Sequence, residues 1–147
     1  MKVYQLSNEE KLLGFTHRVE LTHADLTETV ANTAQTIALI ALGINQLVTR
    51  CATRLVTAFK NSADAAFNTT TLIVGDDGST NRYLASQELN ENGTEVLCKG
   101  GTGTIYAYEV ANTVDAVFGS MAAKSLVDLD TGEVHIYLHV CDLDDLG

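Results

Sequence analysis

The chain has 147 residues, 46% of them hydrophobic, and its nineteen Asp and Glu residues outnumber nine Lys and Arg residues. This length and apolar content are typical of a globular protein with its own core, and they exclude a disordered chain. The formal net charge of −10 argues against partners that need a cationic surface, namely nucleic acids and anionic membranes.

The N-terminal residues Met1–Gly14 are predicted to form an arm or a short helix. Ser7 is a suitable helix cap, and Glu10 follows it at capping-box spacing. Phe15–His23 then alternates in character, which predicts a strand whose inner face carries Val19 and Leu21 beside histidines.

Two longer segments follow. Gln35–Leu42 is apolar and β-branched and is predicted to be a strand. Leu47–Phe59 is ambiguous on periodicity, because a helical i, i+4 stripe coexists with many β-branched residues. The strands predicted on both sides of this segment favour a strand here too.

The second half of the chain contains short candidate strands separated by Gly, Asn and Asp turns. Met121–Leu126 is predicted to be a loop or one helical turn. The candidate strands are Asn68–Asp76, Arg82–Leu89, Thr94–Cys98, Thr104–Val110 and Thr113–Phe118.

The clearest strand lies in Gly132–Leu143. Val134, Ile136, Leu138 and Val140 fall on one face, whereas His135, Tyr137, His139 and Cys141 fall on the other. The aliphatic face is expected to belong to the core. About eight short strands without regular intervening helices predict an all-β fold, an antiparallel, jelly-roll-like β-sandwich. Residues 1–147 are expected to form a single domain, with 1–14 as a possible arm.

No residue pattern points to catalysis or to a metal. His135 and His139 are separated by about 13 Å along a strand, too far to share one ion without ligands from other strands. The turn around Asp76 and Asp77 lacks the spacing of a calcium loop, and Gly100–Gly103 lacks the residues of a phosphate-binding loop. The sequence therefore predicts a non-enzymatic protein without catalytic, cofactor-binding or metal residues, and it leaves the partner-binding residues unassigned.

The cysteines, the apolar segments and the N-terminus indicate the cellular compartment that we expect for the protein. Cys51, Cys98 and Cys141 are odd in number and have no CxxC spacing, which favours small core or face residues in a reducing compartment. The longest apolar stretch, Ile37–Leu42, is too short for a membrane span. The N-terminus shows no hydrophobic region of a secretory signal.

Several segments together resemble the head decoration, or cement, proteins of tailed bacteriophages, which have jelly-roll-like β-sandwich folds. The resemblance covers roughly residues 20–143, and the first fourteen residues lie outside it. The segments that carry it are Leu47–Asn61, Thr71–Gly78, Asn92–Val96, Val114–Phe118 and Gly132–Leu138.

The resemblance implies a structural virion protein on the capsid exterior, assembled in the cytoplasm of a host bacterium. Its expected partners are the major capsid protein and copies of itself, as a dimer or trimer. It implies no catalytic residues and no cofactor. The alternatives are a carbohydrate-binding β-sandwich or another virion module of the tail or neck. A carbohydrate-binding role is less favoured because the chain has nine aromatic residues and no Trp.

Overall fold

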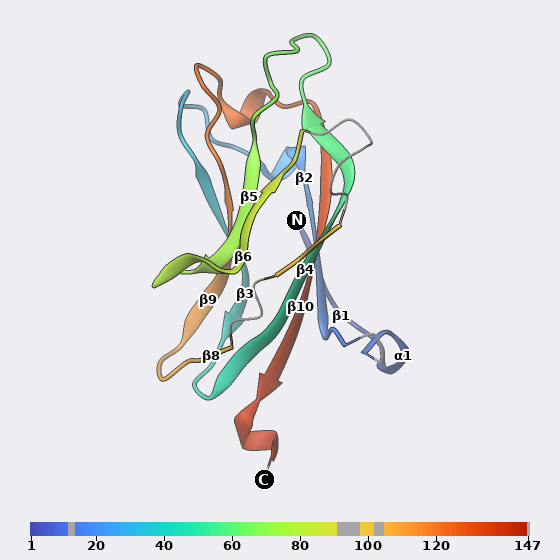
Figure 1. The fold of residues 1–147 in the computed structure, drawn as a ribbon, viewed down its shortest axis with the longest axis vertical. Coiled ribbons are helices and arrows are strands. Elements are labelled where there is room, and N and C mark those ends of the chain that lie inside the picture. The colour runs from blue at the N-terminus through green and yellow to red at the C-terminus, as the bar shows by residue number, and fades with distance from the viewer. Residues whose placement is uncertain (12–13, 91–97, 102–104, 147) are drawn as a thin grey trace.

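The structure is a computed structural model that describes residues 1–11, 14–90, 98–101 and 105–146. Within these residues, ten strands form two antiparallel sheets that face each other as a sandwich (Figure 1). The predicted all-β, antiparallel sandwich is therefore confirmed.

The two sheets differ in size and in strand order. The larger sheet has the order β1-β2-β10-β4-β7, and β8 also pairs with β4. Its strands are β1 (Lys2–Gln5), β2 (His17–Thr22), β4 (Gln46–Lys60), β7 (Cys98–Gly100), β8 (Tyr106–Ala107) and β10 (Thr131–Asp142). The smaller sheet has the order β3-β9-β5-β6. Its strands are β3 (Gln35–Leu42), β5 (Thr71–Asp76), β6 (Ser79–Glu88) and β9 (Asn112–Phe118).

The strand β10 lies at the centre of the larger sheet, between β2 and β4. Val134, Ile136 and Leu138 are fully buried, as the alternation predicts. Val140 is only partly buried, because a register shift against β4 between His139 and Val140 interrupts the alternation. The aliphatic face of β10 is thus core along most of its length.

The ambiguous segment is a strand. β4 pairs with β10 from Lys60 opposite Thr131 to Gln46 opposite Asp142. In this extended form Phe59 reaches across the sandwich to Phe118 of β9, with ring centroids 5.6 Å apart. Burial between the two sheets favours a strand over a helix here, because β-branched residues pack well in a sheet. The local sequence does not specify that burial.

The N-terminal residues hold one confirmed and one unexpected element. The predicted short helix is α1 (Asn8–Lys11). β1 precedes it and was not expected, because only four residues alternate there. It is held by pairing with β2, where Val3 lies opposite Val19. Tertiary pairing therefore creates a strand that local pattern does not specify.

Other predicted boundaries need correction. About eight strands were expected, whereas the described residues contain ten. Within the described residues 105–110 of the predicted strand Thr104–Val110, only the two residues of β8 pair with β4. Most of the predicted strand Thr94–Cys98 lies outside the described residues. The predicted loop Met121–Leu126 is confirmed: it is a tight turn closed by a bridge between Met121 and Lys124, and Leu126 begins a 3₁₀ turn.

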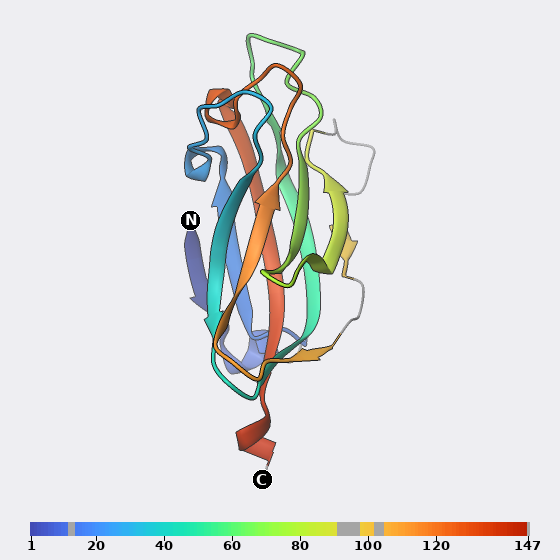
Figure 2. The ribbon, with the colours of Figure 1, turned by 90° about the vertical axis from the view of Figure 1, so that its left-hand side faces the viewer.

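Two opposite ends of the sandwich are built from connections (Figure 2). We call one the loop end; it carries the β4–β5 connection, η1 (His23–Asp25) and η2 (Leu126–Asp128). We call the other the tip; it carries the β3–β4 turn, the β8–β9 turn and the C-terminal η3 (Leu143–Leu146). Among the described helices, none has the length and apolar character to span a membrane.

Candidate interaction surfaces

His135 and His139, which were considered as metal ligands, lie apart, and each contacts another side chain of the protein. His135 Nε2 lies 2.8 Å from Glu133 Oε1, and His139 Nδ1 hydrogen-bonds with Thr49 Oγ1. The described residues contain no cluster of three His, Cys, Asp or Glu side chains that would hold a metal. These histidines are accounted for by contacts within the larger sheet.

Asp76, considered above as a calcium ligand, is a buried structural carboxylate. Its side chain is 1% exposed and accepts hydrogen bonds from Arg82 Nε at 2.6 Å and from Tyr108 Oη at 2.6 Å. The backbone N–H groups of Gly78 and Ser79 donate to its other oxygen. Burial alone would raise the pKa of Asp76, but these hydrogen bonds outweigh it and lower the pKa below its usual value. Its acceptor capacity is used within the fold.

The Asp76 contacts also bind the two sheets together. Asp76 ends β5 in the smaller sheet, whereas Tyr108 follows β8 in the larger sheet. Tyr108 Oη further hydrogen-bonds with Tyr83 Oη of β6. The Arg82 guanidinium lies 3.8 Å from the ring centroid of Tyr106, a cation–π contact. The tyrosines after Gly103 therefore have a structural explanation, and Tyr106 is not a free stacking platform for a sugar.

Cys51 offers little reactivity. Cys51 is a free thiol in the core, and burial raises its pKa to about 12. Cys141 is free and partly buried. The expectation that Cys51 is a small core residue is confirmed, and the side chain of Cys98 lies outside the described part of the chain.

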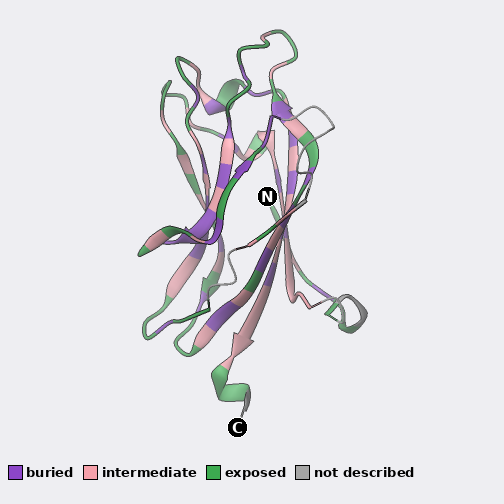
Figure 3. Cartoon of the chain, in the orientation of Figure 1, coloured by how far each residue is buried: buried purple, intermediate pink, exposed green. Residues whose placement is uncertain are grey.

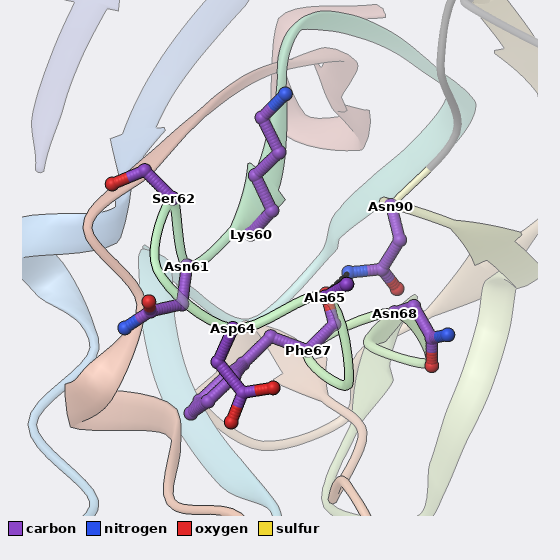
Figure 4. A pocket seen from close by; sticks show the side chains of 8 residues that line it. All are labelled: Lys60, Asn61, Ser62, Asp64, Ala65, Phe67, Asn68 and Asn90. Atoms are coloured by element: carbon purple, nitrogen blue, oxygen red, sulfur yellow. Dashed lines mark hydrogen bonds between the residues drawn. The ribbon is translucent and has the colours of Figure 1, made fainter.

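A pocket at the loop end is the first candidate interaction site (Figure 4). It has a volume of about 330 Å³ and lies between the β4–β5 connection and Asn90, a residue just beyond the end of β6. Phe67 is buried at its apolar side, and exposed polar groups form the rim. Its lining residues are Lys60, Asn61, Ser62, Asp64, Ala65, Phe67, Asn68 and Asn90.

Asn90 gives this pocket an unsatisfied acceptor. The residue is 8% exposed, and its Nδ2 donates to the carbonyl oxygen of Phe59. That hydrogen bond fixes the orientation of the Asn90 amide. The Oδ1 atom of the same amide is buried and has no hydrogen-bond partner in the structure. A buried unpaired acceptor is costly, by about 1–3 kcal/mol. A donor from a bound partner would relieve that cost.

Fixed contacts hold the walls of the pocket. Lys124 forms an ion pair with Asp64 and lies 5.0 Å from the ring centroid of Phe67. Asp130 accepts hydrogen bonds from the backbone and hydroxyl of Ser62. These contacts tie the β4–β5 connection to the segment before β10, so the pocket is a preformed concavity.

The second candidate is the outer sheet face, the side of β1, β2, β10 and β4 that points away from the smaller sheet. Cross-strand pairs place its side chains in rows: for example, Tyr4 lies opposite Arg18, which lies opposite Tyr137. It consists of Lys2, Tyr4, Arg18, Glu20, Thr22, Arg50, Ala52, Arg54, Glu133, His135, Tyr137 and His139.

The outer sheet face differs in charge from the rest of the protein. It carries four of the nine Lys and Arg residues of the chain but two of its nineteen carboxylates. Glu20 pairs with Arg18 at 3.2 Å, and Glu133 contacts His135. Arg50 and Arg54 are exposed on β4, and no ion pair among the described residues includes either of them. This face is therefore locally cationic on an acidic protein.

A shallow depression of about 430 Å³ opens on the tip side of this face. Arg50 and His139 contribute its polar groups, and Ile105, which is 63% exposed, contributes an aliphatic wall. Gly14 lies beside the Arg50 guanidinium, where a Cβ would overlap it. The depression can accept an apolar group next to an anion.

The tip is the third candidate surface. Ile44, Val110 and Leu143 are 58%, 67% and 42% exposed there. Their segments are joined: Asn45 N donates to the Tyr108 carbonyl, and Leu143 N donates to the Asn45 carbonyl, both at 3.0 Å. The tip therefore joins the three segments that carry these exposed apolar side chains. Glu109, Asp144 and Asp145 are exposed beside them.

Sequence reasoning left all three surfaces unassigned. The loop-end pocket depends on Asn90 and Ser62, which are far apart in sequence and carry no motif. The outer sheet face was visible in part, because the alternation in β10 placed His135, Tyr137 and His139 together. Its arginines come from β4, whose pairing with β10 no local pattern specifies.

Comparison with known proteins supports the fold. No protein-family model and no curated protein matches the sequence. A chain from the capsid asymmetric unit of cyanophage Pam1 is similar, with a TM-score of 0.58 and 21% identity, covering 84% of this chain and 79% of that one. A chain from the acidic stable capsid structure of Helicobacter pylori bacteriophage KHP30 has a TM-score of 0.52 and 13% identity, covering 84% and 86%. The β-sandwich is thus one that also occurs in phage capsids.

Proposed function

We propose that the protein is a non-enzymatic structural component of a tailed-phage virion, which binds the outer surface of the capsid and stabilises its lattice. The observation that carries this proposal is the fold shared, over 84% of the chain, with chains of two phage capsid structures. Its partners would be the major capsid protein and further copies of itself. It would be assembled in the bacterial cytoplasm and reside on the capsid exterior.

The charge of the protein supports the exterior location. A net charge of −10 disfavours contact with packed DNA, whose phosphates attract cationic surfaces. The many identical sites of a lattice allow modest affinity at each site to suffice when a bound oligomer bridges several subunits.

We assign the capsid contact to the loop-end pocket. It is preformed, it has an apolar wall at Phe67, and Asn90 Oδ1 lies buried at its lining without a hydrogen-bond partner. A capsid loop that inserts a donor, such as a backbone N–H or an amide, would satisfy this oxygen. Preformed recognition of this kind avoids an ordering cost on binding.

The test uses purified phage heads that lack the protein. After mixing, the heads are pelleted, and their disruption temperature is measured with and without bound protein. We expect saturable binding, regular density on the outer surface and a higher disruption temperature. Protein that stays in the supernatant at micromolar concentration, or that labels only tails, would contradict the capsid role. Binding on a glycan array instead would support the carbohydrate alternative.

A pair of variants tests the pocket separately. Ala65→Trp fills the pocket from its exposed rim, whereas Ala85→Trp places the same side chain on an exposed position of β6. We expect Ala65→Trp to weaken binding to heads at least tenfold and Ala85→Trp to leave it unchanged. Equal binding by both variants would refute the pocket assignment and leave the capsid role standing.

A further inference from the structure

We propose that the protein self-associates by docking the tip of one copy into the depression on the outer sheet face of a second copy. This inference deepens the homo-oligomer part of the proposed function by naming its two surfaces. Its test needs no capsid, so its failure is distinguishable from failure of the capsid role.

The tip has the properties of an inserting element. Leu143 opens η3 and is exposed, with Ile44 and Val110 on the neighbouring turns. Asp144 and Asp145 follow directly, and neither takes part in an ion pair between described residues. An exposed apolar group flanked by exposed carboxylates that no described cation neutralises favours a partner that is apolar at its centre and cationic at its rim.

The tip is held in place by hydrogen bonds within its own chain. Leu143 N donates to the Asn45 carbonyl at 3.0 Å, and Asn45 Nδ2 donates to Asp144 Oδ1 at 3.1 Å. Gln46 Nε2 also donates to Asp142 Oδ2. These bonds fix the start of η3 beyond the end of the larger sheet, where it projects away from the sandwich (Figure 1).

The depression has the complementary properties. Its volume of about 430 Å³ accommodates a branched aliphatic side chain, and Ile105 offers an apolar wall for Leu143 of the second copy. Arg50 lies in the depression, and Arg54 is exposed on the same face of β4, two same-face positions further along with Ala52 between them. The two guanidinium groups would face the two carboxylates. The aliphatic contact would provide the buried apolar area of the interface, and the charges would set the orientation of one copy relative to the other.

Two different surfaces of the chain meet in this contact, so the interface is heterologous. Repetition of such a contact gives a closed ring when the rotation closes and a chain when it does not. The loop end lies at the far end of the sandwich from the tip (Figure 1). The loop-end pocket would therefore stay free in the oligomer.

The first measurement is the mass of the protein in solution, by sedimentation and light scattering, from micromolar concentration upward. We expect the mass to rise with concentration at low salt. The rise should weaken in high salt, because charges at the rim of an interface are screened. A monomer at all concentrations would overturn the proposal.

Charge reversal tests the two surfaces. Asp144→Lys with Asp145→Lys makes both surfaces cationic, and Arg50→Glu with Arg54→Glu makes both anionic. Each double variant should associate at least tenfold more weakly alone. An equimolar mixture of the two should associate again, because each tip then meets a face of opposite charge. Association that survives both reversals, or a mixture that fails to associate, would overturn the proposal.

Controls separate this effect from net charge and from misfolding. Asp77→Lys with Asp128→Lys makes the same charge change at exposed positions away from the tip and should leave association unchanged. Leu143→Ser alters one exposed terminal side chain and should weaken association at least tenfold while the melting temperature is kept. Wild-type association in Leu143→Ser would contradict the docking of that side chain.

Discussion

Tyr108 donates a hydrogen bond of 2.6 Å to Asp76, and the bond connects the end of β5 in the smaller sheet to the residue that follows β8 in the larger one. Tyr108→Phe removes the donor from a buried carboxylate, so we expect a loss of about 1.5–3 kcal/mol of unfolding free energy. Chemical denaturation measures it. Tyr4→Phe is the control, since Tyr4 donates to the partly exposed Glu20 at 3.1 Å, and it should cost less than about 1 kcal/mol. Equal losses would show that burial of the acceptor does not matter.

The same carboxylate makes stability depend on pH. Hydrogen bonds from Arg82 and Tyr108 outweigh burial and hold the pKa of Asp76 below 3.8. A depressed folded-state pKa means that its stabilisation is complete above the unfolded pKa and is lost as pH falls through the folded pKa. We expect the melting temperature to fall below about pH 4. In Asp76→Asn this part of the acid dependence should be absent, and an unchanged profile would contradict the assignment.

The two faces of β10 should respond differently to truncation. Ile136 is fully buried between the sheets, so Ile136→Ala should cost about 2–5 kcal/mol. His135 lies on the outer sheet face with its side chain 15% exposed and bonded to Glu133, so His135→Ala should cost less than about 1 kcal/mol. Chemical denaturation of both variants measures the difference, and the reverse order would mean that the faces are misassigned.

Gly132 is expected to resist substitution. Its φ of +147° lies where side chains are rarely found, and a Cβ would overlap the Phe59 ring. Gly132→Ala should therefore cost at least about 1–3 kcal/mol, the usual range for overpacking. Gly100 is the matched control, because no atom lies within 4 Å of the Cβ position there. If the Gly132 and Gly100 variants have the same melting temperature, the expected steric overlap at Gly132 is contradicted.

Thiol reactivity should follow burial. The pKa of Cys51 is raised to about 12 by burial, so at pH 8 almost none of it is thiolate, the reactive form. In native protein we expect an alkylating reagent to modify Cys141 at least tenfold faster than Cys51, with both modified equally after unfolding. Peptide mass spectrometry resolves the sites. Rapid native labelling of Cys51 would show that the core opens.

The period-2 pattern was sufficient to predict strands in which apolar and polar residues alternate in the sequence itself. β10 and β9 bury the residues that the alternation selects, including Val134 and Val114. Prediction was less complete where pairing or burial supplies the decisive energy. β1 exists because β2 pairs with it, and the register shift beside Val140 is set jointly by two strands.

The candidate surfaces were harder to predict for the same reason. Asn90 reads as a turn residue, and only the fold buries its amide and leaves Oδ1 unpaired. Arg50 and His139 are 89 positions apart in the chain but directly opposite in the larger sheet. Asp76 is a turn residue by sequence, and its cross-sheet role depends on Tyr108, which a different strand delivers.

The position of β10 has a consequence for biosynthesis. The last regular strand of the chain lies between β2 and β4, and Thr16 bonds to Leu138 across 122 positions. β2 therefore cannot pair with β10 until more than a hundred further residues have been synthesised, and contacts of such separation slow folding. Until β10 is available, β2 can pair only with β1 on its other side, so the larger sheet cannot be completed before β10 is synthesised.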